Sequence, residues 1–144
     1  MSTLDCAIAL AAKAHLGQQD KSGKPYILHP LRLMFRLEND TERMVAVLHD
    51  VIEDTEINRA HLAGLGFPEE VLEALDRLTH VGEEPYEAYI ERIAAHPLAR
   101  RVKLMDLEDN MDIRRLSQPW SERDIQRLQK YRRAWERLRA LSPE

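Results

Sequence analysis

Apolar residues recur along most of this chain at the three- and four-residue spacing that places side chains on one face of a helix. After Pro68, for example, one such face collects Val71, Leu72, Leu75 and Leu78. No segment alternates convincingly between apolar and polar residues, as a half-buried strand would. The pattern therefore predicts an all-α fold in which residues 1–144 form a single domain, a helical bundle with short connections.

Prolines and capping residues predict where the helices begin and end. Ser121, with Asp124 three residues later, caps the last helix. Pro30 disfavours helical geometry at the residue before it, so His29 is expected just outside a short helix over 31–37, with its ring turned inward. The other helices are expected at 3–16, 42–52, 58–63, 68–78, 86–95 and from residue 97 onward.

The central helix is expected to end in an unusual cluster of ionisable residues. The apolar run 44–48 leads directly into a segment that contains His49, Asp50, Glu53 and Asp54. Charged groups leave water only when they are paired or bound to a metal. If the helix continues this far, residues four apart share a face, and the imidazole and three carboxylates point roughly one way. This set suits a divalent first-row metal. The alternative, an acidic surface turn at a helix C-terminus, opposes the helix dipole.

A second unusual stretch lies in the helix that follows residue 97. Asp106 has an apolar neighbour on either side, which favours burial, and a buried carboxylate needs a partner. Asn110, four residues later, shares its face, whereas Glu108 and Asp112 are expected on a solvated face. With His29 and the His49-Asp50 pair, Asp106 gives two imidazoles and two carboxylates from separate helical segments.

These motifs, in this order, resemble those of the HD-domain metal phosphohydrolases. More closely, the sequence is similar to the (p)ppGpp 3′-pyrophosphohydrolase domain, the alarmone hydrolase domain, of RelA/SpoT-type enzymes. The resemblance covers most of the chain, from about His15 to Asn110, and three ordered motifs are far more specific than any one of them. The segments that carry it are Ala14 to Gln18, Lys21 to Pro30, Leu48 to Thr55 and Val102 to Asp106.

The resemblance implies an HD-type helical bundle that holds one divalent metal ion, with Mn²⁺ as the expected ion. Carried over position by position, the metal ligands would be His29, His49, Asp50 and Asp106. The activity implied is that of a metal-dependent phosphohydrolase, in which the metal activates a water molecule that attacks phosphorus.

The resemblance also implies roles for residues around the metal. Glu53 and Asp54 match the positions that activate the attacking water. Lys21 and Ser22 match substrate-contacting positions in a loop, and Asn110 matches another residue of the substrate pocket. The substrate would be a nucleotide or a related phosphate or pyrophosphate ester, with guanosine 3′,5′-bis(diphosphate) as the family's own substrate.

Some residues depart from the family pattern. Asp20 stands where the family usually has an arginine that packs against the guanine base, and aspartate offers neither a planar cation nor attraction for phosphate. Asp109 replaces a common histidine, and Asp112 and Ile113 replace the usual arginine and threonine. These departures leave the identity of the substrate undetermined, whereas the residues expected to bind the metal and activate water match the family.

Two other functions remain open. One is a nucleotide-binding regulator that keeps the pocket but hydrolyses weakly or not at all, which the departures favour. The other is a helical interaction module that docks a partner or RNA through the last helix. The basic residues of that helix are Arg123, Arg127, Lys130, Arg132, Arg133, Arg137 and Arg139.

Composition narrows the partners further. The chain has a formal net charge of −4 and lacks the general basic excess of nucleic-acid-binding proteins. Its single cysteine, Cys6, excludes an internal disulfide. No apolar run approaches the roughly 20 residues of a membrane span, and no signal peptide is recognisable. We therefore expect a cytoplasmic protein that binds a small phosphorylated molecule, with no nucleic acid and no membrane as partner.

Overall fold

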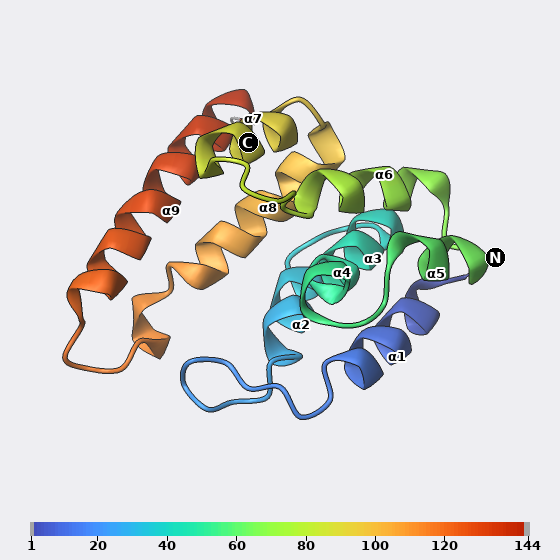
Figure 1. Ribbon diagram of the computed structural model, residues 1–144, viewed down its shortest axis with the longest axis horizontal. Helices are drawn as coiled ribbons and strands as arrows, with labels where there is room; N and C mark the ends of the chain where they lie inside the picture. The colour runs from blue at the N-terminus through green and yellow to red at the C-terminus, as the bar shows by residue number, and fades with distance from the viewer. Residues whose placement is uncertain (1, 143–144) are drawn as a thin grey trace.

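The computed structural model describes residues 2–142, and regular secondary structure in this part of the chain is helical apart from one isolated bridge between Gln19 and Pro25 (Figure 1). This confirms the all-α fold predicted from the spacing of apolar residues. The elements are α1 Leu4–Ala14, α2 Leu28–Phe35, α3 Asp40–Leu48, α4 Val51–Asp54, α5 Arg59–Gly64, α6 Glu69–Leu78, α7 Tyr86–Ala94, α8 Pro97–Asn110, the short 3-10 helix η1 Ile113–Arg115, and α9 Glu122–Leu141.

Helix α3 forms the centre of the bundle and packs against α1, α2, α6 and α8. Its residues 45–48 are fully buried, and a helix that is apolar on all sides needs such cover from every direction. Its first turn is capped by Asn39, whose side chain accepts a hydrogen bond from the Glu42 backbone N–H. The polar residues that follow α3 therefore emerge from the middle of the core.

Helix α2 begins earlier than the sequence predicts. It starts at Leu28 rather than at 31, so His29 lies within the helix instead of just before it. Pro30 is compatible with this because the first-turn N–H groups of a helix have no intrahelical partner to lose. The expected inward direction of the His29 ring is found, since the residue is only 6% exposed.

The predicted central helix over 42–52 is interrupted. Helix α3 ends at Leu48, and the short helix α4 begins at Val51, with a turn at His49 and Asp50 between them. Asp50 has φ −105° and ψ 0°, outside regular helical values, and the His49 ring nitrogen Nδ1 bonds back to the Ala46 carbonyl. The idea that His49, Glu53 and Asp54 share one continuous helix face is therefore wrong.

Helix α9 packs against α7 and α8 at the edge of the bundle (Figure 1). Ser121 and Asp124 cap it reciprocally, as predicted. The apolar face of α9 is buried only in its second half, where Leu138 is fully covered, whereas Ile125 is 38% exposed. The first turns of α9 border a pocket instead of the core, because Leu128 and Tyr131 line that pocket.

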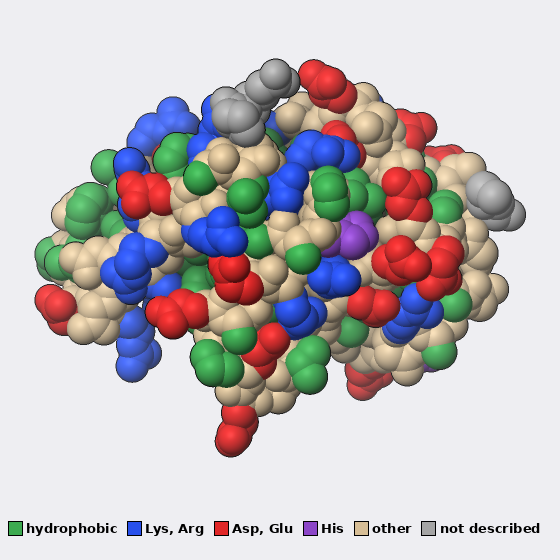
Figure 2. Space-filling model, turned by 90° about the horizontal axis from the view of Figure 1, so that it is seen from above, with side chains coloured by type: hydrophobic (Ala, Val, Ile, Leu, Met, Phe, Trp, Pro, Cys, Tyr) green, Lys and Arg blue, Asp and Glu red, His purple; other side chains and the backbone are tan. Residues whose placement is uncertain are grey.

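The surface does not present a continuous basic area on the face seen in Figure 2, where Lys and Arg are interspersed with Asp and Glu. Several arginines of α9 are paired with carboxylates: Arg127 with Asp124, Arg132 with Glu136, and Arg137 with Glu91. This arrangement is typical of a solvated helix face. Within residues 2–142, none of the helices has both the length and the apolar character needed to cross a bilayer.

Candidate metal centre and adjoining pocket

Four side chains that are distant in sequence meet between α2, α8 and the end of α3. His29 comes from the first turn of α2, His49 and Asp50 from the turn after α3, and Asp106 from α8. His29, His49 and Asp106 are at most 6% exposed. The two imidazole rings meet edge to face, with centroids 5.3 Å apart. The structure thus brings together all four residues that the resemblance assigns to a metal.

The spacing of their donor atoms suits a single ion. Asp106 Oδ1 lies 2.8 Å from His29 Nε2 and 3.4 Å from His49 Nε2, and Asp50 Oδ2 lies 2.9 Å from His49 Nε2. One donor atom each from His29, His49 and Asp50 fall within 4.8 Å of one another. Ligand atoms about 2.1 Å from an octahedral ion are about 3 Å apart, so one divalent cation matches this set.

The hydrogen bond behind the His49 imidazole leaves its Nε2 available as a ligand. His49 Nδ1 lies 2.6 Å from the Ala46 carbonyl oxygen, which can only accept, so Nδ1 carries the proton. His49 Nε2 is buried and makes no hydrogen bond within the described residues. A buried imidazole nitrogen with no hydrogen bond, facing two carboxylates, is the position that a cation would fill.

The carboxylates of Asp50 and Asp106 favour a positive charge beside them. Burial lowers the pKa of His49, but the nearby charge of Asp50 and Asp106 outweighs it and the pKa lies well above its ordinary value. Burial would raise the pKa of Asp50, yet the charge of His49 brings it down to about 2. The Tyr26 hydroxyl also donates a hydrogen bond to Asp50. Ionised carboxylates therefore surround the imidazoles, and a divalent cation in place of their protons supplies the same positive charge.

Asp106 is held from its other side by Lys103, whose side chain is only 11% exposed. Lys103 Nζ lies 2.8 Å from Asp106 Oδ2. Burial lowers the pKa of Lys103, but the charge of Asp106 raises it well above its ordinary value. Asn110, expected at the substrate pocket, does line that pocket and also donates a hydrogen bond to Asp106 Oδ1 over 3.2 Å. Lys103 and Asn110 therefore hold the Asp106 carboxylate in one orientation, and the charge of Lys103 keeps it ionised.

Asp109 supports His29, a role that the sequence did not suggest. Its Oδ2 lies 2.6 Å from His29 Nδ1, and Arg32 donates two hydrogen bonds to the Asp109 carboxylate over 2.8 and 3.0 Å. Arg115 lies 3.1 Å from the same carboxylate. A carboxylate behind a metal-binding imidazole fixes its orientation and increases its basicity. The signal was present in the spacing, because Asp109 follows Asp106 by three residues and Arg32 follows His29 by three.

Glu53 and Asp54 lie at the rim of this cluster on α4. Both are exposed, and the Asp54 backbone N–H bonds to the Asp50 carbonyl over 3.0 Å, which places α4 directly after the candidate ligand. Glu53 accepts a hydrogen bond from the His80 backbone N–H. Partial desolvation and the charges of Asp50 and Glu53 raise the pKa of Asp54. A carboxylate with a raised pKa is better suited to accept a proton than an ordinary one.

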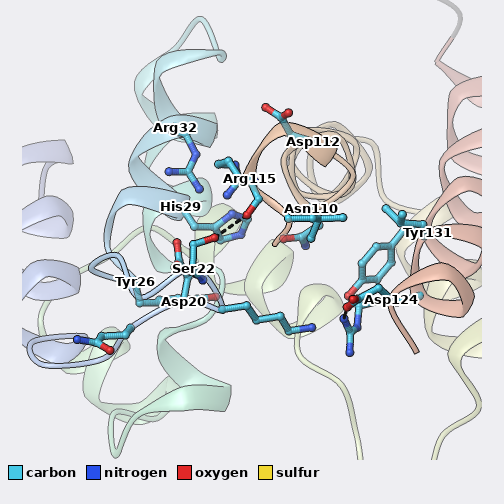
Figure 3. Close-up of a pocket in the computed structure, with 15 residues that line it drawn as sticks. Asp20, Ser22, Tyr26, His29, Arg32, Asn110, Asp112, Arg115, Asp124 and Tyr131 are labelled. Atoms are coloured by element: carbon cyan, nitrogen blue, oxygen red, sulfur yellow. Dashed lines mark hydrogen bonds and ion pairs between the residues drawn. The ribbon is translucent and has the colours of Figure 1, made fainter. Parts of the chain in front are cut away.

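A pocket of about 320 Å³ adjoins the cluster and has His29 in its wall (Figure 3). Arg32, Arg115 and Asn110 surround His29 in this view, and Tyr26 and Tyr131 lie on opposite sides. All three residues expected to contact substrate are part of the lining. The lining residues are Gln19, Asp20, Lys21, Ser22, Tyr26, His29, Arg32, Asn110, Asp112, Arg115, Leu116, Asp124, Arg127, Leu128 and Tyr131.

The loop between α1 and α2 shapes one wall of the pocket. Asp20 Oδ1 accepts hydrogen bonds from the backbone N–H groups of Ser22 and Lys24 over 2.8 and 3.0 Å, so this departure from the family pattern organises the loop. The Ser22 hydroxyl donates to the Arg115 carbonyl over 2.6 Å and ties the loop to η1. The opposite wall comes from α9, through Arg127 and Tyr131, which lie beyond the region of resemblance.

Comparisons with known proteins agree with this architecture. No family model matches the chain. Over 115 residues, 74% of the chain, it is 33% identical to a guanosine-3′,5′-bis(diphosphate) 3′-pyrophosphohydrolase of Aquifex aeolicus. Over 133 residues, 82% of the chain, it is 32% identical to the protein of the same name from Vibrio cholerae. The chain spans only 16% and 19% of these two relatives.

A solved structure shares the fold. It is described as a metazoan ortholog of SpoT that hydrolyses ppGpp, and it superposes with a TM-score of 0.81 over 94% of this chain and 85% of that one, at 24% identity. The chain therefore has the HD-type helical bundle of that hydrolase. Together with the two sequence relatives, this confirms the resemblance predicted from the motifs.

Proposed function

We propose that residues 1–144 form one metal-dependent phosphohydrolase domain, and that its first candidate substrate is guanosine 3′,5′-bis(diphosphate), from which it removes the 3′ pyrophosphate. One observation carries the proposal: donor atoms of His29, His49, Asp50 and Asp106 converge in a buried site. The adjoining pocket, with several cationic side chains in its lining, supports a phosphorylated ligand. The two relatives named as pyrophosphohydrolases point to the same reaction.

His29, His49, Asp50 and Asp106 would hold the ion, and Mn²⁺ fits this mixed set of imidazole and carboxylate ligands. When bound, the ion would lower the pKa of a coordinated water and offset negative charge on the phosphoryl group. Asp109 would keep His29 in place by accepting the hydrogen bond of Nδ1–H.

The carboxylates of α4 would handle the proton. In this proposal, Asp54 accepts a proton from the attacking water, and Glu53 orients that water. The water oxygen then forms a bond to phosphorus, the bond from phosphorus to the 3′ oxygen of the nucleotide breaks, and that oxygen takes up a proton. The raised pKa of Asp54 supports its role as the base.

Cationic side chains of the pocket would bind the phosphates. Lys21 comes from the α1–α2 loop, Arg32 and Arg115 flank His29, and Arg127 lies on α9. Because Asp20 is engaged in its loop, it does not replace the arginine that packs on guanine in the family. Tyr131 is the aromatic side chain on the wall opposite Tyr26, and we propose that it contacts the base instead.

The proposal is tested with purified protein that is stripped of metal, reloaded with Mn²⁺ and given a nucleotide panel that includes guanosine tetraphosphate and simple monophosphates. We expect pyrophosphate release from guanosine tetraphosphate. Asp50→Ala should lose both metal and turnover, whereas Asp54→Asn should retain metal and lose turnover. Asp40→Ala, an exposed aspartate in the first turn of α3, is the control.

Two outcomes would contradict the proposal. Full turnover by Asp50→Ala would show that the assigned ligands do not hold the reactive ion. Tight nucleotide binding with no release in the Mn²⁺-loaded protein would instead favour the nucleotide-binding regulator, the function that the substitution at Asp20 suggests.

A further inference from the structure

The direction of the Glu53 side chain depends on a different part of the chain. Glu53 is exposed and sits on α4, a helix of 4 residues. Its carboxylate accepts a hydrogen bond from the backbone N–H of His80, in the loop between α6 and α7. An exposed glutamate on so short a helix has little else to restrict its rotamer. The α6–α7 loop, residues 79–85, therefore determines where this carboxylate points.

Arg92 on α7 holds that loop at both ends. Its guanidinium donates to the Thr79 carbonyl over 3.1 Å, at the start of the loop, and to the Glu84 carboxylate over 2.7 and 2.8 Å, near its end. It also reaches the Asp76 and Arg77 carbonyls at 3.2 and 3.4 Å. The last carbonyls of a helix have no intrahelical donor, so Arg92 satisfies the end of α6 while it closes the loop.

Arg92, bonded to Thr79 and Glu84, forms a clamp on the α6–α7 loop, and the surroundings of Arg92 make this clamp rigid. Its guanidinium lies over the Tyr89 ring, 5.7 Å from the centroid, and the Tyr89 hydroxyl donates to the Leu78 carbonyl over 2.6 Å. The His80 ring packs against the same tyrosine, with centroids 5.1 Å apart. The side chains of Arg92 and Glu84 are only 30% and 17% exposed, so water weakens their ion pair less than it would a fully exposed one.

We infer that Arg92 is a positioning residue for the reaction: through the α6–α7 loop it holds the His80 N–H against Glu53 and so orients the Glu53 carboxylate. The inference rests on the proposed function, in which Glu53 acts on the attacking water. Arg92 itself has no contact with the candidate metal ligands in the described hydrogen bonds and ion pairs. Its hydrogen bonds lead to Glu53 through the loop. The Tyr89 ring gives a second link toward Asp106, because Lys103 also lies over it at 5.2 Å, and unchanged Mn²⁺ affinity in an Arg92 variant would set this second link aside.

A double-mutant cycle tests the inference with the Mn²⁺-loaded protein and guanosine tetraphosphate. Arg92→Gln should lower kcat about tenfold, because small misplacement of a reacting group is costly, while KM and Mn²⁺ affinity stay unchanged. In a Glu53→Gln background, the Arg92→Gln substitution should cause no further loss of kcat. Arg92→Lys should rescue only in part, since lysine lacks the planar fork that reaches carbonyl and carboxylate together. Arg59→Gln, which breaks an exposed ion pair with Glu69 and Asp76, is the control.

Amide hydrogen exchange at His80, measured by NMR on the same proteins, gives a readout independent of activity. Exchange should become faster in Arg92→Gln and in Glu53→Gln, and remain unchanged in Arg59→Gln. Should Arg92→Gln fail to fold, Glu84→Gln removes the far end of the same clamp and must show the same coupling to Glu53.

The possible failures are distinguishable. If Glu53→Gln keeps full turnover, or no nucleotide is hydrolysed, the role assigned to Glu53 in the proposed function is wrong, and the positioning role of Arg92 falls with it. If both single variants lose activity but their losses add, or if His80 exchange does not respond to Arg92→Gln, only the inference about Arg92 is overturned.

Discussion

The two groups of polar residues at the site are held in opposite ways. The candidate metal ligands are buried or largely buried and are held by hydrogen bonds: Asp109 of α8 holds His29 of α2, and Lys103 and Asn110 hold Asp106. Glu53 and Asp54 are exposed on the short helix α4 and depend on loop contacts. The contrast teaches that the candidate cation site is part of the core, whereas the groups proposed to act on water lie at its rim. Changes in the first group should affect stability and metal binding together, and changes in the second should affect turnover alone.

Asp106→Ala should have the largest effect. It would leave Lys103 as a buried charge without its partner and remove the carboxylate that faces both imidazoles. Breaking a buried ion pair from one side costs about 3–5 kcal/mol. We expect a loss of that size in urea denaturation and loss of bound metal by elemental analysis. A loss below about 1 kcal/mol, the range of exposed pairs, would contradict the view that the site is part of the core.

Removal of the metal should have the second-largest effect on stability. An ion that binds only the folded state stabilises it by about 2.7 kcal/mol when present at 100 times its Kd. We expect chelation to lower the free energy of unfolding by about this amount and re-addition of Mn²⁺ to restore it, as followed by denaturation with and without chelator. In Asp50→Ala the same titration should have no effect. An unchanged midpoint for the parent protein would argue against an ion at these four residues.

Asp109→Asn should have an intermediate effect. The amide keeps the shape of the side chain but weakens its hold on His29 and its ion pairs with Arg32 and Arg115. Loss of such a supporting carboxylate typically lowers metal affinity 10- to 100-fold. Calorimetric titration with Mn²⁺ measures this directly, and Asp112→Asn, which acts on the exposed Arg114, is the matched control. Equal Mn²⁺ affinity in both variants would show that Asp109 does not contribute to metal binding.

Asp54→Asn should have the smallest effect on folding. Substitutions at exposed positions usually change stability by at most about 0.5 kcal/mol, and metal binding should be retained. Turnover should nevertheless fall by about 10²–10⁴, the usual contribution of a general base. Because the pKa of Asp54 is raised above 3.8, activity of the parent protein should fall as the pH drops through that raised value. The loss of this acidic limb in Asp54→Asn, seen in a pH–rate profile, would identify the group.

Much of the fold follows from the sequence because the helices are short and strongly patterned. The buried face of α6 is the one expected from the spacing of its apolar residues, and the cap at Ser121 is found where predicted. The meeting of His29, His49, Asp50 and Asp106 was expected from motif order rather than from geometry. Their distances depend on how α2, α3 and α8 cross, which no local pattern specifies.

The two incorrect predictions of helix boundaries have a common cause. Pro30 was expected to keep His29 out of a helix, and the central helix was expected to run through His49 without interruption. Local propensity favours both expectations, but tertiary contacts override it at each place. The roles of Asp109 and Arg92 were missed for a related reason, although the spacing of Asp109 and Asp106 on one helix face was visible in the sequence. Their partners lie about 80 residues away or in another loop, so their roles exist only once the chain has folded.

The interruption between α3 and α4 also has a chemical consequence. Along an unbroken α-helix, successive side chains diverge by about 100°, so sequence neighbours cannot chelate one cation. The two-residue corner at His49 and Asp50 removes this divergence, and it brings an imidazole nitrogen and a carboxylate oxygen to 2.9 Å. Two of the four candidate metal ligands are thus supplied by one dipeptide. Any substitution that straightened this corner into regular helix would separate the two donor atoms of this pair without changing either residue.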